Sequence, residues 1–215
     1  MKNSLLIICG FLLISSLAQA QGSGKDAEAL FAEINAYLKE GKLDELVGPL
    51  KQAISLEPTN VSLYITLGSV YDKLFQRELQ RRNEAKATEY FEEAKKYYLE
   101  ATAQDPENFD ATYSLGALFY NKAAARTSEL SSLSEDFSSA GLKEFERRKK
   151  VIRGLFDQAL PYFQKAESLD PSDFMTLIAL SEIYARKDDE TLAAEFRKRL
   201  DTVKRGGKNN ASYFK

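Results

Sequence analysis

Three acidic-proline pairs divide most of this chain into segments with the same internal pattern. Glu57-Pro58, Asp105-Pro106 and Asp170-Pro171 each follow an apolar stretch with helical periodicity and precede a new one. Proline lacks the backbone donor that a helix interior needs, and it disfavours helical geometry in the residue before it. We therefore expect a series of helices with breaks at these three pairs.

Large and small side chains recur at fixed distances from the three prolines. Small residues allow two helices to approach closely and large ones fill the space beside them, so the pattern predicts packed helix pairs. An unrelated helical bundle with coincidental prolines is the alternative. The recurring residues are Tyr64, Leu67-Gly68 and Tyr71 after Pro58; Thr112, Leu115-Gly116 and Phe119 after Pro106; Leu177, Leu180-Ser181 and Tyr184 after Pro171; Ala94, Tyr98 and Ala101 before Pro106; and Ala159, Phe163 and Ala166 before Pro171.

This pattern resembles the tetratricopeptide repeat, a helix-turn-helix unit of about 34 residues with W-x2-L-G-x2-Y…A-x3-F…P. The resemblance implies an all-α fold, a right-handed superhelical stack of about four helix hairpins, because one unit cannot bury its apolar face alone. The chain contains no Trp, and Tyr64 and Thr112 stand at that position in the second and third units. We place the units at about 27–60, 61–108, 109–173 and 174–207.

The second and third units are longer than the family repeat, and the excess falls between their two helices. Residues 72–87 contain no helix breaker and should lengthen both helices of the second unit. In the third unit, a Ser-rich run over 127–140 precedes one long helix over 142–169, with a bend expected at Pro161. The family keeps its hairpin turns on one edge of the stack, so both extensions should lie side by side as a helical projection.

The first twenty residues have the pattern of a cleaved secretory signal. Lys2 precedes an apolar run from Leu5 to Leu17, and Ala18-Gln19-Ala20 offers a small-x-small cleavage site. The run is far shorter than the roughly 20 residues of a membrane-spanning helix. We expect export to the periplasm or cell envelope with cleavage before Gln21, while an uncleaved anchor stays the alternative. No later segment is apolar enough to span a membrane.

Composition removes most catalytic and metal chemistry. The chain has no His, and its one cysteine, Cys9, lies in the predicted signal. Thiol nucleophiles, Cys/His zinc sites and a histidine general base are therefore excluded, and we expect no enzyme, cofactor or metal. Asp188-Asp189-Glu190 lacks the spacing of a calcium loop and suits a turn before a helix. A net charge of −2 argues against general binding to nucleic acid.

The resemblance also implies a concave groove lined by the first helix of each unit, where members of the family bind peptides or helices. Tyr113 and Tyr120 could anchor a partner there or pack against a neighbouring unit or the projection. A Lys/Asn clamp for a C-terminal carboxylate is not matched, because the lysines are missing. The implied groove residues are Ile65, Ser69, Asp72, Tyr113, Ala117, Tyr120, Asn121, Ile178, Glu182 and Arg186, with Phe31, Asn35 and Leu38 in the first unit.

We therefore expect an exported scaffold or adaptor that binds a protein or peptide through the groove, the projection or both. A structural subunit that self-associates through the open ends of the stack is the alternative, and a cell-wall enzyme using Asp72 and Glu182 is a third. The basic run 147–153 should be a solvated helix face, because Glu144 and Glu146 can pair with it. The polar tail over 208–215 should be frayed.

Overall fold

The computed structural model describes residues 24–130 and 138–214, so the predicted signal over 1–20 and the middle of the Ser-rich run lie outside the described residues. Across these ranges the chain forms helices and no strands, which confirms the all-α prediction. No described helix is long and apolar enough to cross a membrane. The helices are α1 (Gly24–Glu40), α2 (Leu43–Leu56), α3 (Val61–Gln80), α4 (Glu84–Gln104), α5 (Phe109–Leu130), α6 (Ser139–Leu169), α7 (Phe174–Arg186) and α8 (Glu190–Lys204).

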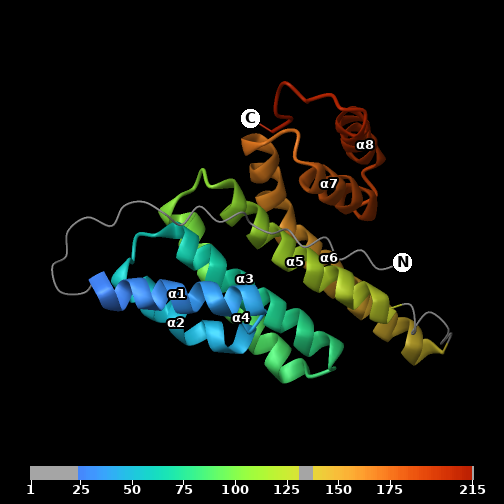
Figure 1. The fold of residues 1–215 in the computed structure, drawn as a ribbon. Helices are drawn as coiled ribbons and strands as arrows, with labels where there is room; N and C mark the ends of the chain where they lie inside the picture. Colours follow the sequence, from blue (N-terminus) through green and yellow to red (C-terminus); the bar gives the residue numbers. More distant parts are fainter. Residues whose placement is uncertain (1–23, 131–137, 215) are drawn as a thin grey trace.

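Consecutive helices pair as hairpins, and each hairpin packs on the next (Figure 1). The pairs are α1–α2, α3–α4, α5–α6 and α7–α8. Packing between hairpins runs from α2 to α3, from α4 to α5 and from α6 to α7. The molecule is therefore a stack of hairpins.

The three proline turns between hairpins share one hydrogen bond. The backbone N–H of Asn60 donates to the carbonyl of Glu57 at 3.1 Å, and Asn108 and Asp173 repeat this bond to Asp105 and Asp170. The preceding acidic side chain also accepts a bond in each turn, for example from the Asn60 side chain at 2.7 Å. These local bonds explain why the acidic-proline pairs end each unit.

The predicted small positions are where the helices cross most closely. Ala94 and Ala159 are fully buried. A Cβ added at Gly68 would lie 2.7 Å from Cδ1 of Tyr98, and one added at Gly116 would lie 3.2 Å from Cβ of Tyr162. The ring of Tyr98 therefore occupies the space that any larger residue at position 68 would need.

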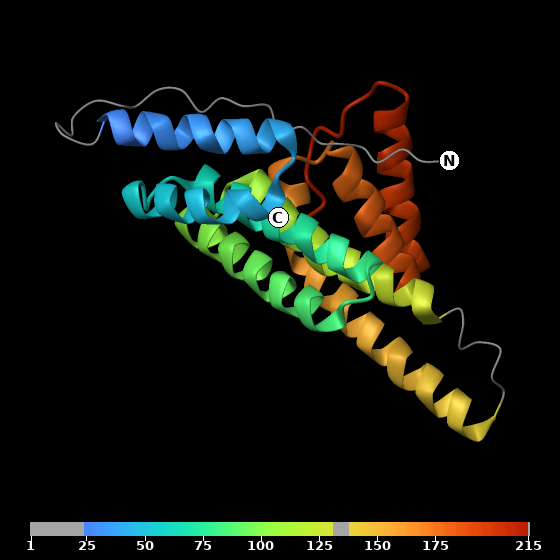
Figure 2. The ribbon, with the colours of Figure 1, turned by 60° about the horizontal axis from the view of Figure 1, so that its bottom comes forward.

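The helices of the second and third units are extended, as the excess length predicts. α3 and α4 have 20 and 21 residues and α5 and α6 have 22 and 31, against 13 and 15 in the last unit. The two extensions point the same way, and α6 reaches furthest (Figure 2). An ion pair between Arg126 and Glu84 joins them. α6 continues through Pro161, and Ser138 caps its first turn by accepting a bond from the N–H of Gly141.

The described turns inside the first, second and fourth hairpins each contain a residue with left-handed backbone geometry. Gly41 has φ +70° between α1 and α2, whereas Arg82 has φ +58° between α3 and α4, and Asp188 has φ +61° between α7 and α8. Glycine adopts this region without steric cost, while a side chain makes it unfavourable. Arg82 therefore holds a position where the same turn of the first unit has glycine.

The end of the chain differs from the frayed tail that its polar composition predicts. Residues 209–214, here called the tail segment, turn back from α8 and lie against the last turns of α6. Phe214 is partly buried and packs against the core. The cause is a set of hydrogen bonds to a buried carboxylate on α6, described below.

Candidate partner-binding groove

The ten predicted groove residues lie on the first helices of three successive units. α3 carries three of them, α5 four and α7 three, and every one keeps some solvent exposure. Ile65, Ala117 and Ile178 touch the core with one side and remain partly exposed. Glu182 and Arg186 are exposed. We call this shared surface of α3, α5 and α7 the groove face.

Tyr120 joins two helices of the groove face. Its hydroxyl donates a hydrogen bond to the carboxylate of Glu182, which links α5 to α7. Its ring meets Phe156 and Phe163 of α6 edge-on, with centroids 5.5 and 6.1 Å away. Burial, and then the bond to Glu182, raise the pKa of Tyr120, so its hydroxyl stays a donor at neutral pH. The ring of Tyr120 therefore packs inside its unit, and its hydroxyl lies at the groove face.

Tyr113 is held between two aromatic rings of its own unit. It stacks on Phe109 at 5.7 Å and meets Phe163 edge-on at 5.8 Å. Burial raises the pKa of Tyr113 to about 12. Both tyrosine rings thus pack on α6, the second helix of the same unit, which holds them in fixed positions.

Asp72 is a poorly stabilised carboxyl group on α3. It is partly buried, and the side-chain amide of Gln76 donates to it at 3.1 Å. Burial raises the pKa of Asp72 to about 6, and the Gln76 bond offsets only part of that effect. At neutral pH the group is a carboxylate in a partly apolar setting. A donor or positive charge brought to this point would stabilise it.

Arg186 lies where α7 meets α6. Its guanidinium sits over the ring of Phe156, 5.0 Å from the centroid. Next to it, Lys187 pairs with Asp157, and Arg153 pairs with Asp188 at 3.2 Å. Asp189 then caps α8 by accepting from the N–H of Leu192 at 3.0 Å. The acidic cluster that begins at Asp188 thus forms a turn and a helix start.

The carboxylates of the groove face have different hydrogen-bond partners on different helices. The two carboxylates considered as catalytic residues have separate partners, Gln76 for Asp72 and Tyr120 for Glu182. Over residues 24–130 and 138–214, no three His, Cys, Asp or Glu side chains cluster in a way that could hold a metal ion. The arrangement instead offers hydrogen-bond acceptors beside apolar and aromatic surface.

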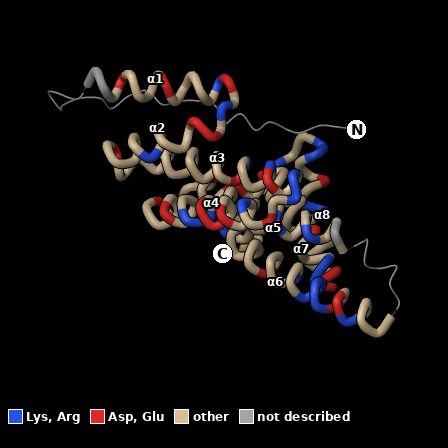
Figure 3. Tube along the Cα trace, turned by 90° about the horizontal axis from the view of Figure 1, so that it is seen from below, with Lys and Arg blue, Asp and Glu red and all other residues tan. Residues whose placement is uncertain are grey.

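A hollow lies between the two extensions. It has a volume of about 960 Å³, and Arg82, Arg147 and Val151 are among its lining residues. Figure 3 shows that Lys and Arg, with acidic residues among them, lie along the part of α6 that extends away from the stack. Arg147 and Arg148 both donate hydrogen bonds to Glu144 at 2.7 Å. These bonds lower the pKa of Glu144 to about 2, and the bond from Arg147 contributes most. The basic run thus carries intrahelical pairs, as its spacing predicts.

Sequence reasoning missed a polar cluster at the C-terminal end of the stack. Glu167 and Arg199 belong to it, and neither stands at a repeat position. A signal was present in the aromatic pair Tyr213-Phe214, which ends an otherwise polar tail. Adjacent aromatic side chains rarely stay in solvent when a surface is available to bury them.

Comparison with known proteins supports the fold. No protein-family model matches the chain, and no curated protein sequence matches it. A solved structure described as MamA MSR-1 C2 aligns with a TM-score of 0.55 and 18% identity, covering 87% of this chain and 82% of that chain. YrrB, a TPR protein with an unusual peptide-binding site, aligns over 84% of this chain and 88% of its own, at 20% identity and a TM-score of 0.34. A tetratricopeptide repeat protein from Parabacteroides merdae covers 83% and 80%, at 18% identity and a TM-score of 0.24.

Only the first of these likenesses is close enough to carry an argument about the fold. Together with the eight described helices and their pairing, it confirms an all-α stack of repeated helix hairpins, the kind of fold that the resemblance to the tetratricopeptide repeat predicts.

Proposed function

We propose that this protein is an exported scaffold or adaptor that holds a peptide or protein segment against the groove face of α3, α5 and α7. The observation that carries the proposal is the repetition of partly exposed side chains at equivalent places on successive first helices. Ile65, Tyr113 and Ile178 are partly exposed, and each directly follows a buried residue at the same repeat position. The buried residues are Tyr64, Thr112 and Leu177. An extended segment running across the helices would meet apolar contacts at regular intervals.

The polar groups of the groove face indicate the chemistry of the partner. Asp72 is a carboxylate with one amide donor, and Glu182 is exposed beside the Tyr120 hydroxyl. A segment with a lysine, an arginine or free backbone N–H groups near Asp72 would stabilise both the complex and the carboxylate. We therefore expect a partner segment that combines apolar side chains with at least one positive charge or exposed donor.

Crosslinking from defined positions tests this proposal. A photo-reactive amino acid at Ser69 or Ile178 places the probe on the groove face, while Glu89, exposed on α4, provides the control. We expect the two groove positions to capture the same protein in native envelope preparations, and Glu89 to capture it much less. Equal capture from all three positions, or no protein from the groove positions, would contradict the proposal.

Export is a separate part of the proposal and rests on the sequence of residues 1–20. Cell fractionation followed by N-terminal sequencing tests it. We expect the protein in the periplasm or envelope fraction with Gln21 as its first residue. A cytoplasmic protein that begins at Met1 would refute export without affecting the binding proposal.

A further inference from the structure

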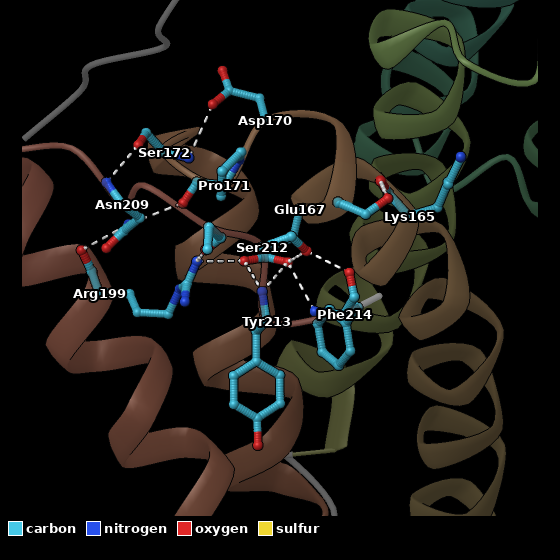
Figure 4. A network of polar contacts seen from close by, with 12 residues as sticks. Lys165, Glu167, Asp170, Pro171, Ser172, Arg199, Asn209, Ser212, Tyr213 and Phe214 are labelled. Atoms are coloured by element: carbon cyan, nitrogen blue, oxygen red, sulfur yellow. Dashed lines mark hydrogen bonds and ion pairs between the residues drawn. The ribbon is translucent and has the colours of Figure 1, made fainter.

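The tail segment occupies a cleft between α6 and α8 in the way that a bound peptide occupies its receptor (Figure 4). The cleft is made by Glu167 in the last turns of α6, by Pro171 and Ser172 in the following turn, and by Phe196 and Arg199 on α8. We call this cleft the tail seat.

Glu167 is the centre of the tail seat. Its side chain is fully buried. The carboxylate accepts from the backbone N–H of Tyr213 at 2.9 Å and of Phe214 at 3.4 Å, and from the hydroxyl of Ser212 at 2.6 Å. Arg199 donates to it at 2.7 Å. Three of the four residues that satisfy this buried carboxylate thus belong to the tail segment.

The seat also bonds to a backbone carbonyl of the tail segment and to the side chain of Asn209. Arg199 donates a second bond, at 2.6 Å, to the carbonyl of Ala211. The side-chain amide of Asn209 donates to the carbonyl of Pro171 at 2.9 Å, and its backbone N–H donates to the hydroxyl of Ser172 at 2.9 Å. These contacts fix the direction of the tail segment across the cleft.

Aromatic contacts supply the apolar part of the site. The ring of Phe196 is fully buried and stacks on Tyr184 of α7. On the tail side, Tyr213 lies 5.4 Å and Phe214 5.6 Å from the same ring. Aromatic pairs at these distances add to the energy of burial. The tail segment therefore presents a hydroxyl residue followed by two aromatic residues to the seat.

The link between α8 and the tail segment can act as a hinge. α8 ends at Lys204, and Gly206 has φ +81°, followed by Gly207. Between Arg205 and Asn209 the chain can extend by about 3.4 Å for each residue. So short a link reaches the seat of another molecule only when the two C-terminal ends face each other, which is the geometry of a two-fold pair.

We propose that the tail seat is a peptide-binding site, and that its partner is the tail segment of a second copy of this chain. In the isolated molecule the tail segment fills its own seat. In a two-fold pair each tail segment crosses to the other molecule and makes the same bonds, with Glu167 and Arg199 as the receptor groups. The inference does not depend on the groove face, so the two proposals can fail separately.

A peptide added from solution tests whether the seat recognises sequence. The protein is shortened to end at Gly207, and a fluorescent peptide of residues 208–214 is titrated against it, with circular dichroism verifying the fold. We expect saturable binding that weakens at least about tenfold when both peptide aromatics are alanine, or when the protein carries Glu167→Gln. The full-length chain should also bind at least about tenfold more weakly, because its own tail competes at high effective concentration. If the shortened chain does not fold, the full-length double variant Tyr213→Ala, Phe214→Ala takes its place.

Mixing two complementary variants tests the second copy as partner. One protein is the shortened chain, which has a seat and no tail segment, and the other is full-length Glu167→Gln, which has a tail segment and a damaged seat. We expect each to be monomeric alone and the mixture to form a one-to-one complex in light scattering. Failure of the peptide to bind would overturn the site, while peptide binding without a complex would overturn the second copy as its occupant.

Discussion

The two ends of the stack are closed by different kinds of contact. At the N-terminal end α1 packs chiefly on α2, burying Leu30 and Ile34 while Phe31 stays partly exposed. At the C-terminal end the tail segment satisfies the buried carboxylate of Glu167 and covers Phe196 with two rings. A terminal unit has one neighbour instead of two, so part of its apolar face needs another cover. The N-terminal end is thus covered by a helix with few neighbours. The C-terminal end is covered by the tail segment, which is held by hydrogen bonds to Glu167.

This difference has consequences for stability and for dynamics. A helix that buries few side chains opens locally at low cost, whereas a buried charge loses much of its stabilisation when its partners leave. The C-terminal end should therefore unfold together with the rest of the stack, and α1 should open first. Substitutions at the two ends can separate these behaviours.

The largest effect is expected at Glu167. Replacing it by alanine leaves Arg199 charged at a position where little solvent reaches it, and removes the acceptor for three groups of the tail segment. Glu167→Ala should lower the free energy of unfolding by about 3–5 kcal/mol in urea denaturation. The control is Glu190→Ala, which removes an exposed ion pair with Arg197 and should cost at most about 1 kcal/mol. Equal losses for both variants would mean that the tail segment does not close this end.

Paired core truncations compare the ends directly. Leu177 in α7 and Ile34 in α1 are both almost completely buried. Leu177→Ala should lower the global free energy of unfolding by about 2–5 kcal/mol, because it creates a cavity inside the stack. Ile34→Ala should affect the global transition less and should accelerate amide hydrogen exchange within α1. Uniform acceleration across all helices in Ile34→Ala would show that α1 is part of one cooperative unit.

The middle of the stack gives a reference between the two ends. Gly68→Ala places a Cβ 2.7 Å from the ring of Tyr98 and should cost about 1–3 kcal/mol. Gly154 lies inside α6 with nothing within 4 Å of an added Cβ, so Gly154→Ala should stabilise by about 0.5–1 kcal/mol. Melting temperatures that move in opposite directions confirm the crossing at Gly68. A stabilising Gly68→Ala would show that Tyr98 is elsewhere.

A pH titration examines the carboxyl group of the groove face, which lies away from both ends. The folded protein binds the Asp72 proton more tightly than the unfolded chain, since its pKa is about 6 instead of 3.8. Protonated Asp72 therefore stabilises the folded protein. This stabilisation is complete below pH 3.8 and is lost as the pH rises through 6. Asp72→Asn should match the natural chain near pH 4 and exceed it by about 1–2 kcal/mol at pH 7.5. Equal stability of Asp72→Asn and the natural chain at pH 7.5 would mean that Asp72 is well solvated.

The repeats could be predicted from the sequence because their rules are local. The bonds around Glu57-Pro58 and the small residues at Gly68 and Ala94 depend on neighbours a fixed number of positions away. The extended helices followed from the excess length for the same reason. The groove residues were implied by the resemblance to the tetratricopeptide repeat, and they lie partly or fully exposed on α3, α5 and α7. Partner binding at these residues stays a prediction.

The tail seat could not be predicted because it depends on contacts between distant parts of the chain. Glu167 reads as one more polar residue near the end of an amphipathic helix, and its burial results from the return of Tyr213 and Phe214. Likewise, the bond from Tyr120 to Glu182 needs the relative positions of α5 and α7. Periodicity gives the face of a helix but not the partner that lies against it.

The smallest effect concerns the turns inside the first two hairpins, Gly41 and Arg82. Both residues are left-handed, with φ of +70° and +58°. Arg82→Gly should therefore raise the free energy of unfolding by about 1 kcal/mol, whereas Gly41→Ala should lower it by a similar amount. Calorimetry should show this as a shift of about 2–4 °C upward for Arg82→Gly. Arg82 also lines the hollow between the two extensions. The groove-face crosslinking can therefore be repeated with Arg82→Gly. If the variant is more stable but no longer crosslinks to the partner, the strained Arg82 contributes to partner binding at the extensions. A stabilised variant with unchanged crosslinking would assign partner binding to the groove face alone, and an unstabilised one would refute the left-handed turn.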